Sequence, residues 1–148
     1  MCIRDSSNNT VNKVIKDDLG FLWIATNDGL HRYDGPNSMT VFKTDTINNS
    51  NSLASNLIRT LSKDSKGNLW IGTRYGGLTR YNSYTNEWKT YRHQTDDSTS
   101  ISHDEILCIH EDSQQRLWIG TEDGLNLFNF KTESFLSLIH ISEPTRPY

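Results

Sequence analysis

The sequence predicts an all-β fold, a β-propeller fragment of about three four-stranded antiparallel blades that form an open arc. Nearly the same five residues, Leu-Trp-Ile-Gly/Ala-Thr, begin at Leu22, Leu69 and Leu117. The tryptophans of these copies are 47 and 48 residues apart, and repetition at a fixed period of this length is the signature of a repeat fold. Each period holds short runs rich in β-branched and aromatic residues, as a propeller blade does. No stretch repeats apolar residues at helical spacing, which favours strands over helices.

The predicted strands follow the same order in each copy. They span 11–16, 21–26, 29–33 and 39–44 in the first copy, 58–63, 68–73, 77–81 and 87–93 in the second, and 106–111, 116–121 and 124–128 in the third, where a fourth run is cut off near residue 135. A closed propeller has roughly four to eight blades, so about three blades form an open arc. Each outer blade of an arc exposes an apolar face, which predicts poor solubility.

The residues between these runs are typical of hairpin turns. Asp17 and Asp64 begin the first turn of their copies, and each is followed three residues later by a glycine that tolerates positive φ. The third copy has Gln115 in place of that glycine, which predicts some backbone strain. Asp-Gly pairs at 28–29 and 123–124 suit tight turns between the second and third strands. The middle copy has Arg-Tyr-Gly-Gly there, which is one residue longer.

The repeated residues are expected to hold the blades together, because residues that recur in every copy serve the scaffold. The small residues Ala25, Gly72 and Gly120 are expected to leave room for a close neighbour, such as an aromatic ring of the next blade. The structural repeat motif comprises Leu22, Trp23, Ile24, Thr26, Gly29, Leu69, Trp70, Ile71, Gly72, Thr73, Gly77, Leu117, Trp118, Ile119, Gly120, Thr121 and Gly124.

A specific site should lie where the copies differ. Tyr75 in the lengthened turn, with Tyr84 and Trp88 near the hairpin between the third and fourth strands, are the candidate ligand contacts. The alternative for these aromatic side chains is that they cover turns or strand edges. Arginines at 32, 74 and 80 are expected to be isolated, solvated charges.

The sequence lacks the residue patterns of nucleic-acid binding, membrane contact, metal binding and catalysis. The formal net charge of −3 argues against a nucleic-acid groove, and the absence of an 18-residue apolar run argues against membrane contact by this segment. No histidines or cysteines have metal-ligand spacing, so no metal, cofactor or catalytic residue is predicted. Cys108 is expected to be a small buried hydrophobic residue.

The two ends of the chain share nothing with the repeats. Residues 1–6 and 136–148 resemble the translation of a sequencing-library adapter, read on opposite strands, and are excluded from the fold prediction. The remaining part, about 7–135, is expected to be an internal piece of a longer protein. It divides into a first blade with its linker at 7–57, a second at 58–105, and a partial third blade at 106–135.

The repeat resembles the two-component regulator propeller repeat, Asp-x-x-Gly-x-Leu-Trp-Ile-Gly-Thr-x-x-Gly-Leu-x-x-Tyr. The second copy matches it from Asp64 to Tyr81, with one extra residue before Gly77. The first copy departs at Ala25, and the third departs at Gln115 and at Phe128. The segments 52–58 and 100–106 resemble the family's linker. The resemblance covers nearly all of 7–135.

The resemblance implies a periplasmic ligand-sensing domain of a hybrid two-component histidine kinase of the Bacteroidetes type, anchored in the inner membrane. It implies a small saccharide ligand, the rest of the receptor chain as partner, a homodimeric parent and no enzymatic activity in this segment. Two alternatives stay open. One is a protein-interaction propeller scaffold, and the other is a propeller lyase or glycosidase whose catalytic residues lie in other blades.

Overall fold

The computed structural model describes residues 10–36, 38–42 and 57–139, and every regular element among them is a β-strand. The strands form three four-stranded antiparallel sheets, none of them closed, in which each strand pairs with its neighbour in sequence. The strands are β1 (Val11–Lys16), β2 (Leu22–Thr26), β3 (Gly29–Gly35) and β4 (Ser38–Phe42); β5 (Ile58–Lys63), β6 (Asn68–Thr73), β7 (Leu78–Asn82) and β8 (Glu87–Tyr91); and β9 (Ile106–Glu111), β10 (Leu117–Thr121), β11 (Gly124–Asn129) and β12 (Ser134–Ile139). The predicted all-β fold is thereby confirmed.

The predicted strand bounds agree closely with the structure. The first strand of each blade has the predicted bounds, whereas β8 ends two residues early, at Tyr91. The prediction that the last run stops near Phe135 is wrong. Strand β12 continues to Ile139 and pairs with β11 through Leu127 and Leu136, because ladder pairing needs backbone amides and carbonyls whatever the side chains. Residues 1–9 and 140–148 of the two ends, and 52–56 of the linker, lie outside the described residues.

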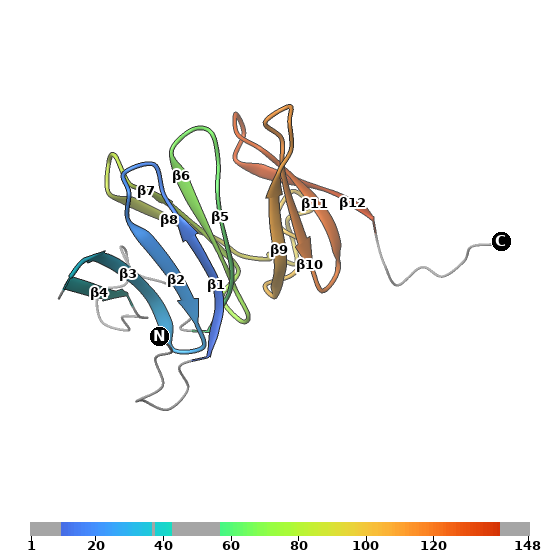
Figure 1. The fold of residues 1–148 in the computed structure, drawn as a ribbon. Helices are drawn as coiled ribbons and strands as arrows, with labels where there is room; N and C mark the ends of the chain where they lie inside the picture. Colours follow the sequence, from blue (N-terminus) through green and yellow to red (C-terminus); the bar gives the residue numbers. More distant parts are fainter. Residues whose placement is uncertain (1–9, 37, 43–56, 140–148) are drawn as a thin grey trace.

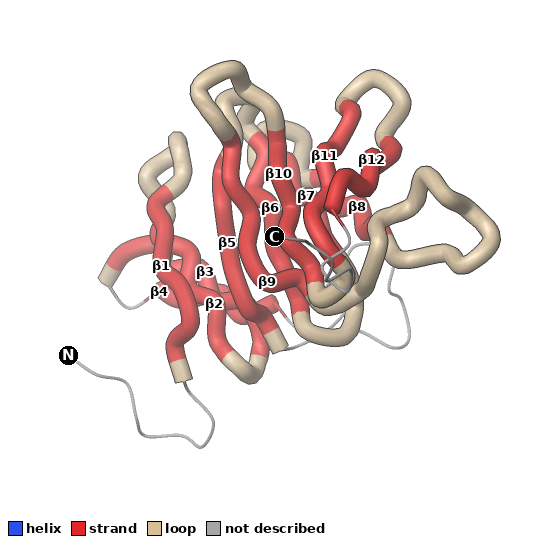
Figure 2. Tube along the Cα trace, turned by 90° about the vertical axis from the view of Figure 1, so that its right-hand side faces the viewer, coloured by secondary structure: helices blue, strands red, loops and turns tan. Residues whose placement is uncertain are grey.

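The three sheets lie side by side as blades of an arc, with the middle blade between the other two (Figures 1 and 2). The first strand of each blade is an edge strand, and β5 lies between β1 and β9. Polar contacts join these strands: the Asn12 side-chain amide donates to the Ile58 carbonyl at 2.7 Å, and Arg59 pairs with Glu105 at 3.1 Å. The arrangement confirms an open arc of three blades.

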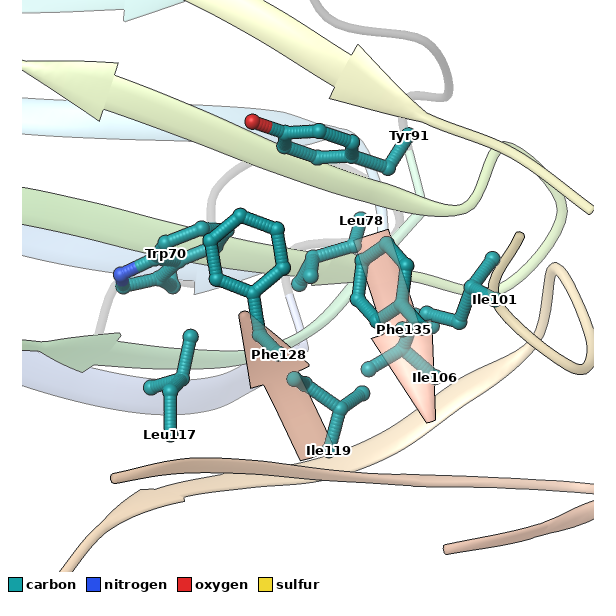
Figure 3. Packing of buried hydrophobic residues seen from close by; sticks show 9 residues of the cluster. All are labelled: Trp70, Leu78, Tyr91, Ile101, Ile106, Leu117, Ile119, Phe128 and Phe135. Carbon is teal, nitrogen blue, oxygen red and sulfur yellow. The ribbon is translucent and has the colours of Figure 1, made fainter. Parts of the chain in front are cut away.

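A hydrophobic cluster fills each of the two junctions between blades. Between the first and second blades, Trp23 packs on Tyr81, with their ring centroids 5.5 Å apart. Between the second and third blades, Trp70 packs on Phe128 at 5.1 Å, as Figure 3 shows. Trp23 and Trp70 are fully buried. The same position of the first two blades therefore contributes a buried tryptophan to the junction that follows each of them.

The small residue of the motif permits close approach, but its neighbour is aliphatic. A Cβ at Gly72 would lie 2.6 Å from Cγ2 of Ile106, in the next blade, and 2.7 Å from Cγ2 of Thr60. At Gly120 the near atom is Sγ of Cys108, in the same sheet. The expectation of an aromatic ring is therefore wrong at these glycines. The first strand of the next blade, and not its aromatic residue, approaches most closely.

Cys108 is exposed, contrary to the prediction. It lies on the face of the third sheet that carries Trp118 and Gly120, through the pairing of β9 with β10. The equivalent residue of the second blade, Thr60, is buried because the third blade covers it. No described blade covers the corresponding face of the third sheet.

Candidate functional site

One hydrogen-bond network fixes the repeated tryptophan in the second blade. Oδ2 of Asp64 accepts the indole N–H of Trp70 at 2.8 Å and the side-chain amide of Asn68 at 3.0 Å. Oδ1 of the same carboxylate accepts the backbone N–H groups of Lys66 and Asn68, both at 2.9 Å. One buried carboxylate thus closes the β5–β6 turn and satisfies the only polar atom of the buried indole.

The same network recurs in the other two blades. Asp17 accepts the indole N–H of Trp23 at 2.7 Å, and Asp112 accepts that of Trp118 at 2.9 Å. The hydrogen bond from Trp118, followed by the one from the Arg116 backbone, holds the pKa of Asp112 below its usual range. Since all three copies share the network, it serves the scaffold.

The threonine of the motif closes the other end of each second strand. The Thr73 hydroxyl donates to the Gly77 carbonyl at 2.9 Å and accepts the Gly76 N–H at 2.9 Å. Thr26 and Thr121 make the equivalent pair of hydrogen bonds in their blades. The repeated residues therefore pin both turns that flank the tryptophan strand.

Two arginines that were expected to be isolated charges instead lie over the repeated tryptophans. The guanidinium of Arg32 is 5.5 Å from the Trp23 ring centroid, and that of Arg80 is 5.7 Å from that of Trp70. Arg32 pairs with Asp34 at 2.7 Å, and Arg80 with Glu133 at 3.7 Å. The expectation was wrong because cross-strand register places each arginine beside its tryptophan on one face of the sheet.

The β6–β7 turn is one residue longer than its equivalents in the other two blades. Tyr75, at its tip, is 65% exposed, and the Arg74 guanidinium lies 5.4 Å from its ring centroid. The turn is anchored on both sides: the Arg74 N–H donates to the Leu57 carbonyl at 3.0 Å, and the Gly77 N–H to the Asp104 carbonyl at 2.9 Å. An exposed aromatic ring therefore stands on a backbone that the neighbouring connections hold in place.

Two residues that the sequence did not single out complete this end of the blade. Oε2 of Glu105 lies 3.1 Å from a guanidinium nitrogen of Arg59 and 3.8 Å from Nε of Arg74. These side chains come from β5, the β6–β7 turn and the residue before β9. Together with Tyr75 they offer a ring face, two cationic groups and a carboxylate at one end of the second and third blades. We call this group, Arg59, Arg74, Tyr75 and Glu105, the turn cluster.

The other two candidate aromatic residues do not join the turn cluster. Tyr84 lies in the β7–β8 turn, at the opposite end of β7 from Tyr75, and its ring packs over Gly67. Trp88 packs on Tyr81 and Phe42, with ring centroids 4.4 and 5.2 Å apart, at the junction of the first two blades. The structure therefore separates the three aromatic residues. Their role as ligand contacts stays a prediction.

A groove of about 580 Å³ lies beside the β7–β8 hairpin and the ring of Phe130, which belongs to the third blade. Lys66 lies 4.4 Å over the Phe130 ring, while Lys89 and Arg80 both pair with Glu133. The hydrogen bond from Lys89 lowers the pKa of Glu133, and burial raises that of Tyr91, which donates to the same carboxylate at 3.1 Å. Most of the positive charge of this groove is therefore balanced within the chain.

Within 10–36, 38–42 and 57–139, no three His, Cys, Asp or Glu residues gather closely enough to hold a metal ion. The same residues contain no helix that is long and apolar enough to cross a membrane.

Comparison with known proteins finds the same family that the repeated motif resembles. The two-component regulator propeller family matches residues 52–75 and 100–123. The extracellular domain of the hybrid two-component system BT3049 from B. thetaiotaomicron is 28% identical, with a TM-score of 0.85 over 95% of this chain and 20% of that one. That of BT4673 from the same organism is 24% identical, with a TM-score of 0.45 over 89% of this chain and 24% of that one. A search of curated proteins found no match.

The chain thus spans about a fifth of the length of the BT3049 domain. Because that domain is extracellular, the similarity agrees with the periplasmic location that the sequence resemblance implied. The matched segments hold the linker, the first strand and the tryptophan strand of the second and third blades. Two segments of this chain therefore match the two-component regulator propeller family, and its three blades resemble part of the extracellular domain of a hybrid two-component system.

Proposed function

We propose that this chain is a non-catalytic segment of a periplasmic sensor propeller and that a small saccharide binds at the turn cluster. The observation that carries the proposal is the exposed Tyr75, at a turn that is one residue longer in the second copy than in the other two. The similarity to an extracellular domain of a hybrid two-component system supports the sensor role.

The chemistry of the turn cluster suits a sugar. The apolar face of a pyranose can stack on the Tyr75 ring, while its hydroxyls can accept from Arg74 and Arg59 and donate to Glu105. The ion pair of Arg59 with Glu105 holds these groups in place before a ligand arrives, which reduces the entropy cost of binding.

Signalling would follow from a difference in the affinity of the ligand for two arrangements of the receptor. A ligand that binds one arrangement of the homodimeric parent receptor more tightly than another shifts the balance between the two arrangements. The turn cluster is suited to this because it joins the second blade to the residue that precedes β9 of the third. In this mechanism the segment binds and transmits but performs no bond-breaking step.

The test is calorimetric titration of the chain with a panel of short neutral and uronate oligosaccharides. Tyr75→Ala should weaken binding of any sugar that binds by about tenfold or more, the scale of one lost stacking contact of ~1.5 kcal/mol. Tyr84→Ala is the matched control and should leave binding unchanged. Equal loss in both variants, or none in either, would remove the turn cluster as the site. Turnover of a sugar would favour the lyase or glycosidase alternative.

A further inference from the structure

The groove beside the β7–β8 hairpin lies at the junction between the second and third blades. Its volume is about 580 Å³, and Phe130 of the third blade forms part of its wall. Cross-strand pairing of Asn68 with Asn82, which also line it, puts both residues on the same face of the second sheet as Trp70, which packs on the third blade. The groove therefore lies within the arc and not on the outer face of the first or the third blade. Pockets of a few hundred Å³ and more commonly hold small organic ligands.

The same place is filled at the first junction. Phe21 is the equivalent of Asn68, because each lies two residues before the tryptophan of its blade. Phe21 packs against the hydrophobic cluster of the first junction, and the Arg32 guanidinium lies 4.8 Å from its ring centroid. The cavity beside Ser83, the equivalent of Phe130, has a volume of only about 10 Å³. The groove is therefore open where the second blade has the smaller, polar asparagine.

The two junctions also differ in charge. In the first blade Arg32 pairs with Asp34 at 2.7 Å. The equivalents in the second blade are Arg80 and Asn82, and the neutral amide of Asn82 cannot balance the guanidinium charge. Arg80 instead lies 3.7 Å from Glu133, a carboxylate that it shares with Lys89. The second junction has thus lost the carboxylate that balances the arginine of the first.

An excess of one positive charge results. The cationic side chains at the groove are Lys66, Arg80 and Lys89, and the carboxylates are Glu87 and Glu133. The Asp64 carboxylate is buried and already accepts four hydrogen bonds. Among the described residues, the exposed Lys66 ammonium lies over the Phe130 ring at 4.4 Å and pairs with no carboxylate. One carboxylate of a ligand would balance this charge.

We propose that the groove binds a small organic carboxylate, with its charge beside Lys66 and its body against Phe130. The two asparagines supply polar partners. The side-chain oxygen of Asn82 accepts the backbone N–H groups of Tyr84 and Thr85 at 2.9 and 3.2 Å, so its NH₂ group is left to donate to a ligand.

Asn68 offers the complementary group. Its NH₂ donates to Asp64 at 3.0 Å, which leaves its oxygen to accept from a ligand. The site therefore presents a cation, a ring, a donor and an acceptor. An inorganic ion would use the cation alone and leave most of the volume empty, which favours an organic carboxylate.

The first test follows the side-chain amide signals of Asn68 and Asn82 by NMR. The probes are sodium glucuronate and sodium benzoate, with glucose and benzamide as their neutral counterparts. At least one carboxylate should shift both signals saturably, and its neutral counterpart should bind at least about tenfold more weakly, the scale of one lost charge-assisted hydrogen bond. The carboxylate that binds shows whether the body of the ligand is a sugar or an aromatic ring. No shift with either carboxylate at millimolar concentration, or equal binding of a carboxylate and its neutral counterpart, would overturn the proposal.

The second test uses variants that change the charge of the groove. Asn82→Asp restores the acidic residue of the first blade, and its carboxylate can still accept the N–H groups of Tyr84 and Thr85. Both Asn82→Asp and Lys66→Met should weaken binding of the carboxylate by about tenfold and leave its neutral counterpart unchanged. Lys13→Met, at an exposed lysine of β1, is the matched control and should bind normally.

Tyr75→Ala distinguishes the groove from the turn cluster. Tyr75 lies at the opposite end of β7 from the β7–β8 hairpin, so its loss should leave binding in the groove unchanged. Loss of carboxylate binding in Tyr75→Ala, with normal binding in Asn82→Asp and Lys66→Met, would place the ligand at the turn cluster and overturn the proposal. Normal binding in all these variants would likewise remove the groove as the site.

Discussion

The Asp64 carboxylate accepts the indole N–H of Trp70 at 2.8 Å, and both side chains are buried. The pair links the first turn of the blade to the tryptophan that fills the next junction. Loss of the carboxylate would leave the indole N–H and two backbone N–H groups without their acceptor. Because a buried donor without a partner costs about 1–3 kcal/mol, this pair should be a principal support of the middle blade.

We therefore expect Asp64→Ala to lower the free energy of unfolding by about 3 kcal/mol, measured by urea denaturation. Asp64→Asn keeps one acceptor oxygen and should lower the free energy of unfolding by less. Asp18→Asn is the matched control, because Asp18 makes only an exposed ion pair with Lys63 at 2.9 Å, and its loss should cost less than about 1 kcal/mol. Equal losses at the two aspartates would show that the carboxylate does not support the turn.

Gln115 should be replaceable by glycine with a gain in stability. Its φ is 63°, where the equivalent residues Gly20 and Gly67 have φ of 95° and 91°. A non-glycine residue in this region costs about 1 kcal/mol, so Gln115→Gly should raise the free energy of unfolding by about that amount. The converse variant, Gly67→Ala, should destabilise the chain, since its Cβ would also lie 2.7 Å from the Tyr84 ring. A loss of stability in Gln115→Gly would contradict the assignment of strain.

Gly72→Ala should destabilise the junction between the second and third blades by about 1–3 kcal/mol, because its Cβ would overlap Ile106. Ile106→Ala removes the overlapping methyl group, so a double-mutant cycle should show favourable coupling between the two changes. Gly120→Ala is the control and should cost less, since the atom it meets is the Sγ of exposed Cys108. If the losses of unfolding free energy in Gly72→Ala and Ile106→Ala simply add in the double variant, the two residues are not in contact.

Acid should weaken the third blade through Asp112. The pKa of its carboxyl is below the usual range in the folded chain, because the indole of Trp118 and the backbone of Arg116 donate to it. A carboxyl group whose pKa is lower in the folded chain than in the unfolded chain stabilises the fold when it is ionised. This stabilisation is present above the unfolded pKa of about 3.9, and it is lost as the pH falls through the folded pKa. Unfolding measured at a series of pH values should therefore show a steeper decline below about pH 4 in the unmodified chain than in Asp112→Asn. Matching slopes would contradict this role.

The strands and their turns could be predicted from the sequence because they depend on local patterns. The period of the motif, the turn residues and the alternation of apolar positions lie within single blades. Tertiary partners could not be predicted in this way. Glu105 and its partner Arg59 are 46 residues apart, and no local pattern indicates that they meet.

Two errors of the sequence-based predictions share one physical cause. The exposure of Cys108 and the placement of Arg32 and Arg80 over tryptophans depend on which face of a sheet a neighbour covers. Pairing register decides each of these contacts, and the register becomes visible only in the folded sheets.

The central claim is that the repeated tryptophans serve the scaffold and that binding occurs elsewhere. Hydrogen exchange of the four indole N–H groups, followed by NMR, tests it most directly. We predict slow exchange for Trp23, Trp70 and Trp118, which donate to Asp17, Asp64 and Asp112, and the slowest exchange for the buried Trp70. Trp88, outside the motif, is the internal comparison. Exchange of the Trp70 indole as fast as that of Trp88 would contradict the account.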